Sequence, residues 1–382
     1  MSAVSFVASL LEHAFSDRAS DIHLEPTVEG LRVRLRVDGL LDTYSGVSSE
    51  MTPQVIARIK VLARMDVSQK RLPQDGTFSI STSTGRRDLR ISTFPSLYGE
   101  KVVIRILERQ AIAMDFSNLG LSEFVLKHLK KMLTRSSGFF LVTGPTGSGK
   151  TTSLYSMLST LNNAERNIVT LEDPIEYHLP GVMQSQMHEE IGFTFARGMR
   201  AILRQDPDVI MVGEIRDRET AEVAIQAALT GHLVLSTTHT HDSVGAVMRL
   251  LDMGIPAFMI NATLSGVLSQ RLVRVLCKYC RRLEKMTDTE QAYVSAMSLS
   301  VSDHYVSVGC TSCNGRGYSG RIGIFELLVL TPTLRESLTV TPSYQTLQRN
   351  AIDSGFQRMH VDAAYKIQNG ITSIAECMRV LY

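Results

Sequence analysis

The chain has 382 residues, of which 44% are hydrophobic and 20% are charged, and its formal net charge is +2. This length predicts two or three domains with real cores, and the small net charge excludes a polyelectrolyte partner bound by overall charge alone. The sequence has no apolar run of the roughly 18 residues that a membrane span needs, and no N-terminal signal segment. We therefore expect a soluble cytoplasmic protein that contacts a membrane only through partners.

Residues 1–108 predict a small α/β domain. Helices are expected from Ser5 to Phe15 and from Pro53 to Met65. Between them, residues 31–37 alternate apolar residues with arginines, which is the pattern of a strand with one buried face. Further strands are expected around residues 78–80, 89–91 and 99–107. Residues 109–121 predict a linker that ends this domain.

The arginines of the alternating strand, Arg32, Arg34 and Arg36, have two interpretations. A row of charges on one face of a strand usually faces solvent. Nucleic acid is the alternative partner, but no aromatic residues alternate with these arginines to stack on bases. We therefore expect a solvated face and no direct nucleic-acid partner.

From about residue 122 to residue 276, short apolar runs alternate with helical stretches, which is the signature of a parallel α/β sheet. Strands are expected at residues 138–143, 167–171, 208–212 and 231–236. Ligands of such sheets bind outside the carboxyl ends of the strands. The polar residues that follow these strands are therefore the candidates for a site.

A glycine-rich loop follows the first of these strands, fits the pattern G-x-x-x-x-G-K-[ST], and leads into a helical stretch. Glycines let backbone N–H groups turn toward phosphate oxygens, and the N-terminus of the helix adds its positive dipole end. Lys150 is expected to reach the β- and γ-phosphates, and the Thr151 hydroxyl to ligate Mg²⁺. The loop thus predicts binding of a nucleoside triphosphate by Gly144, Pro145, Thr146, Gly147, Ser148, Gly149, Lys150, Thr151 and Thr152.

Polar residues end the other three strands. Glu214 follows its apolar run in the form of a Walker B element, whose carboxylate supports Mg²⁺ directly or through water. Glu172 is the first candidate to orient or deprotonate the attacking water, and Asp173 is the second candidate. The sequence leaves open which acid binds the metal ion and which acts on the water. Glu172 and Asp173 could instead only cap a turn. His239 could donate to the γ-phosphate and so sense its presence, or it could be structural.

Two C-x-x-C pairs, Cys277 with Cys280 and Cys310 with Cys313, predict one closed tetrahedral Zn²⁺ site, which would be structural rather than catalytic. Disulfides are the alternative, and the expected cytoplasmic location argues against them. Cys377 lies outside this pattern and is expected to be a buried small apolar residue. Residues 321–382 are expected to be mainly helical.

Six motifs in order along the chain resemble signatures of the type II secretion and type IV pilus assembly ATPases, including the Asp box, Walker B element and His box of that family. The resemblance extends from about residue 18 to the end of the chain. The motifs occupy residues 19–26, 70–76, 144–152, 172–177, 204–217 and 230–239.

The resemblance implies a homo-hexameric ATPase on the cytoplasmic face of a bacterial inner membrane. Such motors use ATP hydrolysis to drive pilin or pseudopilin polymerisation through a polytopic membrane protein. The implied fold is α/β: a PAS-like N-terminal domain (1–108), the linker, and a RecA-like parallel-sheet core (122–276). A tetra-cysteine zinc subdomain (277–320) and a helical C-terminal region (321–382) follow.

Other functions of the same loop are weighed against this one. A retraction motor of the same superfamily is disfavoured because the four cysteines are typical of assembly-type ATPases and absent from the retraction type. A nucleotide-gated scaffold that hydrolyses little is a third possibility, and phosphate release would separate it from a motor. A small-molecule kinase does not fit the glutamate and histidine strand ends.

Two features depart from the family pattern. Assembly ATPases usually carry a further N-terminal domain that docks to a membrane-platform partner, and this chain starts almost directly at the PAS-like domain. Thr77 stands where relatives often have an arginine. We expect arginines of the N-terminal domain to complete the active site, and Arg71, Arg90 and Arg105 are the candidates.

Overall fold

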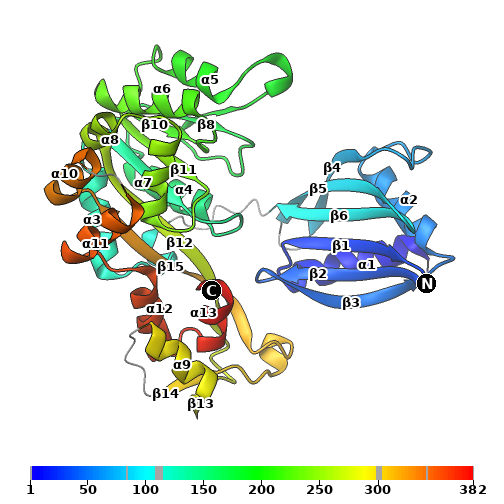
Figure 1. Ribbon diagram of the computed structural model, residues 1–382. Helices are drawn as coiled ribbons and strands as arrows, with labels where there is room; N and C mark the ends of the chain where they lie inside the picture. The colour runs from blue at the N-terminus through cyan, green and yellow to red at the C-terminus, as the bar shows by residue number, and fades with distance from the viewer. Residues whose placement is uncertain (1, 83–84, 108–114, 298–302, 341–342, 382) are drawn as a thin grey trace. The chain divides into compact units, whose positions relative to one another are not determined.

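The computed structural model of the chain describes residues 2–82, 85–107, 115–297, 303–340 and 343–381. The chain divides into two compact units, Met1–Ile112 and Ala113–Tyr382, which have hydrophobic core clusters of their own (Figure 1). The division falls inside the predicted linker at 109–121, of which residues 109–114 lie outside the described residues. The finer division of the second unit into three parts stays a prediction.

The first unit is a six-stranded antiparallel sheet, ordered β3-β2-β1-β6-β5-β4, with two helices packed on one face. Helix α1 (Ala3–Ser16) begins after the capping residue Ser2, and α2 (Thr52–Leu62) has Pro53 in its first turn. The strands are β1 (Asp21–Thr27), β2 (Gly30–Val37), β3 (Leu40–Ser48), β4 (Gln74–Thr82), β5 (Gly85–Ser96) and β6 (Gly99–Leu107).

The predicted strand at 31–37 is confirmed as β2, whose apolar residues lie in the core while its arginines lie on the opposite face. That face is not simply solvated, because acids of β1 lie among the cations. Arg34 Nη2 is 2.7 Å from Glu25 Oε1, and Arg105 Nε is 3.0 Å from Asp21 Oδ1. Sequence reasoning did not predict β1 or β3, and so it missed these partners.

The second unit contains a seven-stranded sheet, ordered β15-β12-β7-β11-β10-β8-β9. All neighbours are parallel except β12 and β15, which are antiparallel. The four predicted strands are confirmed as β7, β8, β10 and β11, with ends shifted by at most two residues. The strands are β7 (Gly138–Thr143), β8 (Ile168–Glu172), β9 (Met183–Gln186), β10 (Val209–Val212), β11 (Leu233–Thr238), β12 (Leu264–Leu276) and β15 (Tyr318–Val329).

Helices cover both faces of this sheet. They are α3 (Glu123–Leu133), α4 (Lys150–Leu161), α5 (Phe195–Ile202), α6 (Arg218–Leu229), α7 (Ser243–Asp252), α8 (Ala257–Thr263), α10 (Pro332–Val340) and α11 (Tyr344–Asp353). Phe139 and Leu141 of β7 pack with α5 to α8, α10 and α11, whereas Phe140 and Val142 pack with α3 and α4. Because both faces are buried, the apolar residues of β7 run consecutively from Phe139 to Val142 rather than alternating with polar ones.

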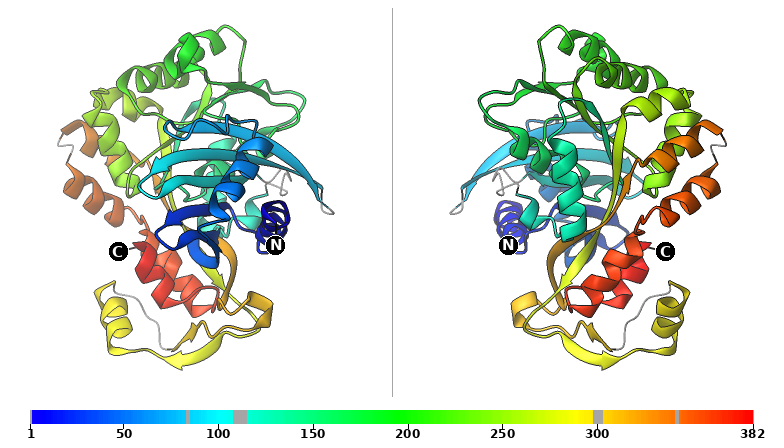
Figure 2. Two further views of the ribbon diagram at one scale, coloured as in Figure 1. Left: turned by 90° about the vertical axis from the view of Figure 1, so that its right-hand side faces the viewer. Right: turned by 90° about the vertical axis from the view of Figure 1, so that its left-hand side faces the viewer.

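A further core cluster joins the C-terminal helices to the outer ends of β12 and β15, which are the last residues of β12 and the first residues of β15. It contains residues of α9 (Asp288–Ala296), α12 (Met359–Gln368) and α13 (Ile374–Leu381). Figure 2 shows α9 in yellow with the small two-stranded sheet of β13 (Arg282–Lys285) and β14 (Asp303–Val306), below the red C-terminal helices. Short 3₁₀ turns lie at Phe116–Asn118, Glu189–Ile191 and Thr311–Cys313.

The prediction that residues 321–382 are mainly helical is confirmed from α10 to α13, but it is wrong at its start, because residues 321–329 belong to β15. This segment is a short apolar run, and periodicity alone cannot distinguish a strand buried on both faces from a buried helix. Its pairing with β12, which runs from Gly266 with Val329 to Leu276 with Tyr318, shows that the segment is a strand. Among the described residues, no helix is both long and apolar enough to cross a membrane.

Candidate functional site

The parallel register brings four strand ends to one edge of the sheet. Thr143, the last residue of β7, pairs with Thr238 of β11, and Val212 of β10 pairs with both Ser236 and Leu171. The glycine-rich loop, Glu214, Glu172 and His239 each follow or end one of these strands, as the sequence predicts for a site at the carboxyl edge.

The glycine-rich loop runs from β7 into α4. Gly149 is the N-cap of α4 and has a left-handed backbone, with φ of 86°. Lys150 is buried, and its ammonium donates to the carbonyls of Gly144 at 2.8 Å and Pro145 at 3.1 Å. Burial lowers the pKa of Lys150 to about 8, with the Glu214 charge opposing the shift and the Arg271 charge reinforcing it. The amine therefore lies inside the loop, where an incoming phosphate could replace the two carbonyls.

A chain of contacts leads from Lys150 to the acid of the predicted Walker B element. His239 Nδ1 lies 3.5 Å from Lys150 Nζ, and His239 Nε2 lies 3.2 Å from Glu214 Oε2. The other carboxylate oxygen of Glu214 contacts Arg216, and this contact raises the pKa of that guanidinium. The structure thus brings together three of the residues that the sequence selects, Lys150, His239 and Glu214.

Glu172 is held separately at the end of β8. Its side chain is almost fully buried, and it accepts hydrogen bonds from the Tyr155 hydroxyl, from Thr170 Oγ1 at 2.6 Å and from Gln184 Nε2 at 3.0 Å. Burial, and then the contact with Glu172, raises the pKa of Tyr155. Asp173, the second candidate, is exposed. The carboxylate of Glu172 is therefore fixed in orientation by three neighbours that no sequence motif marked.

The candidate arginines lie in the first unit. Arg71 is exposed on the loop between α2 and β4, where its backbone N–H donates to Gln69 Oε1. Arg90 of β5 lies directly across the sheet from Thr77 on one side and Arg105 on the other. Arg105, in contrast, already pairs with an acid of its own unit.

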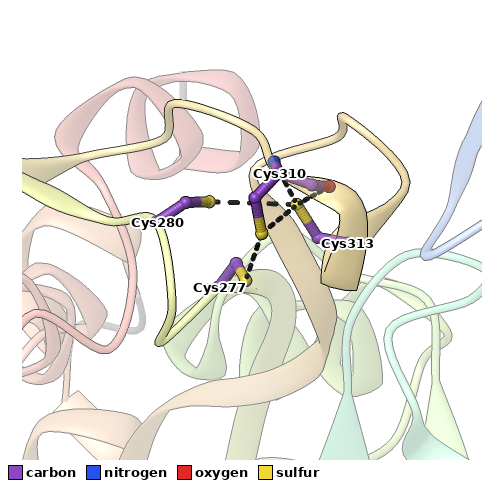
Figure 3. A group of neighbouring side chains, drawn as sticks. All are labelled: Cys277, Cys280, Cys310 and Cys313. Atoms are coloured by element: carbon purple, nitrogen blue, oxygen red, sulfur yellow. Dashed lines mark hydrogen bonds between the residues drawn. The ribbon is translucent and has the colours of Figure 1, made fainter.

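The four cysteines lie together at the outer ends of β12 and β15 (Figure 3). Their sulfur atoms all lie within 4.8 Å of one another, and the distances for three pairs are 3.8 to 3.9 Å. A tetrahedral Zn²⁺ with Zn–S bonds of about 2.3 Å places its sulfurs about 3.8 Å apart. The donor set and its spacing therefore fit zinc. Cys377 is fully buried elsewhere, as predicted, and burial raises its pKa to about 12.

A family model described as type II/IV secretion system protein matches residues 2–379. The chain belongs to this family. The type II secretion system protein E of Pseudomonas aeruginosa is 46% identical over 377 residues, which are 99% of this chain and 75% of that protein. The type IV pilus assembly ATPase PilB of Myxococcus xanthus is 44% identical over 378 residues, which are 98% of this chain and 67% of that protein.

Among solved structures, the pilus retraction motor PilT with bound ADP is similar to this chain with a TM-score of 0.63 and 27% identity, over 97% of this chain and 95% of that one. These findings confirm the resemblance to secretion ATPases that the sequence motifs indicated. They also confirm the predicted fold class: the chain is an α/β protein with a parallel-sheet core and a four-cysteine cluster.

Proposed function

We propose that the chain is an ATPase that forms a homo-hexamer and uses ATP hydrolysis to drive pilus or pseudopilus assembly. The observation that carries the proposal is the contact chain from Lys150 through His239 to Glu214, beside the glycine-rich loop. Lys150, His239 and Glu214 supply an ammonium, an imidazole and a carboxylate at one strand edge. This supports the proposal because phosphoryl transfer needs a cation at the phosphates and an acid that holds the metal ion.

Binding would begin with an exchange of partners. Lys150 would release the carbonyls of Gly144 and Pro145 and donate to the β- and γ-phosphates, while loop N–H groups bind the remaining oxygens. The Thr151 hydroxyl and Glu214 would hold Mg²⁺, which neutralises charge on the phosphate oxygens when bound. These residues fit that ion because hydroxyl and carboxylate oxygens are its preferred ligands.

Hydrolysis would then depend on Glu172 and His239. Glu172 has its carboxylate fixed by three donors at the end of β8, which suits it to orient the attacking water, whereas Asp173 is exposed. His239 contacts both the cation that binds phosphate and the acid that supports the metal. A change in Lys150 on nucleotide binding would therefore change the partners of His239, and this supports a sensing role.

Completion of the site by Arg71 and Arg90 of the first unit is part of the proposal. A phosphoryl-transfer transition state spreads charge over the γ-oxygens, and an arginine there contributes roughly 10³–10⁵ in rate. Arg90 is supported by its register, because it lies opposite Thr77, where relatives often have an arginine. Arg71 is supported by its exposure on a loop that is held at both ends.

The four cysteines would hold one structural Zn²⁺, which would fix the outer ends of β12 and β15. The name of the Myxococcus relative, a type IV pilus assembly ATPase, supports an assembly role, and the cysteine cluster favours it over retraction. The partner would be an inner-membrane platform protein of a secretion or pilus machine. The chain would act at the cytoplasmic face of that membrane.

Light scattering and ATP turnover of the purified chain, measured over a range of concentrations, test this proposal. We expect a mass of six chains and a turnover per chain that rises as the hexamer forms. A monomer at all concentrations, with no phosphate release, would overturn the motor. A hexamer that binds ATP but releases no phosphate would instead favour the nucleotide-gated scaffold.

A further inference from the structure

Gln270 forms a hydrogen bond to the glycine-rich loop, and it lies outside the six family motifs. Gln270 lies on β12 immediately after the point where β12 stops pairing with β7, so that it is level with the start of the loop. Its side chain is 2% exposed. Gln270 Nε2 donates to the carbonyl of Ser148 at 2.6 Å, and Gln270 Oε1 accepts from the Ser153 hydroxyl at 2.7 Å.

The two fixed glycines of the loop lie against this residue. A Cβ added to Gly144 would lie 2.5 Å from the carbonyl oxygen of Gln270, and one added to Gly149 would lie 3.1 Å from Gln270 Nε2. Glycine is therefore needed at these positions partly because β12 approaches so closely, in addition to their positive φ angles. The loop and Gln270 form one packed arrangement.

The bond to Ser148 fixes the direction of a peptide group. In a planar trans peptide the C=O and the N–H point in opposite directions. Because the Ser148 carbonyl points at Gln270, the N–H of Gly149 in the same peptide points away from β12. N–H groups at this end of the loop, next to the N-terminus of α4, are the donors that bind phosphate in loops of this type.

We propose that Gln270 is a positioning residue for phosphate binding: it holds the Ser148–Gly149 peptide in the orientation that presents the Gly149 N–H to nucleotide phosphates. The inference rests on the proposed nucleotide binding at this loop and adds a residue to it. An amide suits the position because it donates to a carbonyl at one end and accepts from a hydroxyl at the other. Ser153 donates to the acceptor end, whereas the bond that orients the Ser148–Gly149 peptide is the one at the donor end.

The test is the dissociation constant of ADP with Mg²⁺, measured by calorimetry for the full chain and its variants, which needs no hydrolysis. Gln270→Leu removes the donor from a buried carbonyl, and we expect the ADP dissociation constant to rise roughly 10- to 100-fold. Ser153→Ala is the matched control, since it leaves the donor to Ser148 in place. It should change the constant by less than about 3-fold.

Gln270→Glu separates positioning from a general packing role. Its ionised carboxylate cannot donate to the Ser148 carbonyl, whereas its protonated form can, and burial favours protonation. The ratio of the variant to the wild-type dissociation constant should therefore fall toward 1 as pH is lowered from 8 to 5.5. The same ratio for Gln270→Leu should stay flat.

Two results would overturn the inference: a ratio for Gln270→Glu that stays well above 1 down to pH 5.5, or a folded Gln270→Leu variant that binds ADP as the wild type does. If Gln270→Leu fails to fold, the pH profile of Gln270→Glu still decides. If the wild-type chain itself binds no ADP, the proposed nucleotide site fails first and the inference falls with it. The two failures are thus distinguished by the wild-type measurement alone.

Discussion

Replacing Lys60 by Met should lower the melting temperature of the first unit sharply. Lys60 on α2 is 1% exposed and Glu100 on β6 is 6% exposed, and their charged atoms lie 2.7 Å apart. The Lys60 ammonium also donates to the carbonyl of Gln69 at 2.5 Å. Removal of the ammonium leaves the Glu100 carboxylate buried without its cation.

The magnitude follows from this burial. Removing one partner of a buried ion pair typically costs about 3–5 kcal/mol, because the remaining charge is uncompensated. For a domain of this size each kcal/mol lowers the melting temperature by about 4–8 °C, so the first unit should lose about 12 °C or more. The Arg218–Glu222 pair, also 2.7 Å long but with both side chains substantially exposed, is the matched control. Arg218→Met should cost less than about 1 kcal/mol.

Scanning calorimetry of the whole chain measures both variants, and the double variant Lys60→Met/Glu100→Met should recover most of the loss. Trypsin cleavage after Lys70 and Arg71 adds a local readout. The Gln69 carbonyl that anchors their loop loses one of its two donors in either Lys60 variant, so cleavage should become faster. A melting temperature of Lys60→Met within about 3 °C of the wild type, with unchanged cleavage, would refute the reasoning.

Three further predictions concern the second unit. Because burial lowers the pKa of Lys150 to about 8 and bound phosphate favours the charged amine, ADP binding must take up a proton above that pH. Calorimetry should show an ADP affinity that is constant below pH 8 and falls by up to about tenfold per pH unit above it. An ADP affinity that stays constant up to pH 10 would contradict this prediction. Elemental analysis should find about one zinc per chain, and Cys277→Ser should lose it and open the outer ends of β12 and β15 to hydrogen exchange. Less than a tenth of an equivalent in the wild type would exclude the site. Glu172→Gln should bind ATP normally but hydrolyse it roughly 10²-fold more slowly, whereas Asp173→Asn should hydrolyse near the wild-type rate; the reverse order would exchange their roles.

The sequence predicted which strand ends meet at the carboxyl edge of the sheet, because its signals are local. A fully buried β7, a glycine loop and an apolar run before Glu214 each occupy a few consecutive residues. Parallel pairing brings their ends together whatever the loops between them do. The cysteine cluster was predictable for the same reason, since each C-x-x-C pair supplies two ligands from one turn.

What the sequence could not provide are contacts between residues far apart in the chain. Gln270 reaches Ser148 only because β12 pairs beside β7, and β12 itself was not predicted. The partners of Glu172 come from α4, β8 and β9, and no motif links them. In the first unit, β1 was missed because its alternation contains only two apolar residues, Ile22 and Leu24, whereas the alternation of β2 contains four.

Steady-state phosphate release by the purified chain with Mg²⁺ and ATP tests the central claim most directly. The wild type should turn over, Lys150→Ala should neither bind nor hydrolyse, and Glu214→Gln should bind ATP while its rate falls about 10²-fold or more. The reason is that Lys150 would bind the phosphates and Glu214 would support the metal in the proposed site. Near-wild-type release by both variants would contradict the assignment of this strand edge as an ATPase site.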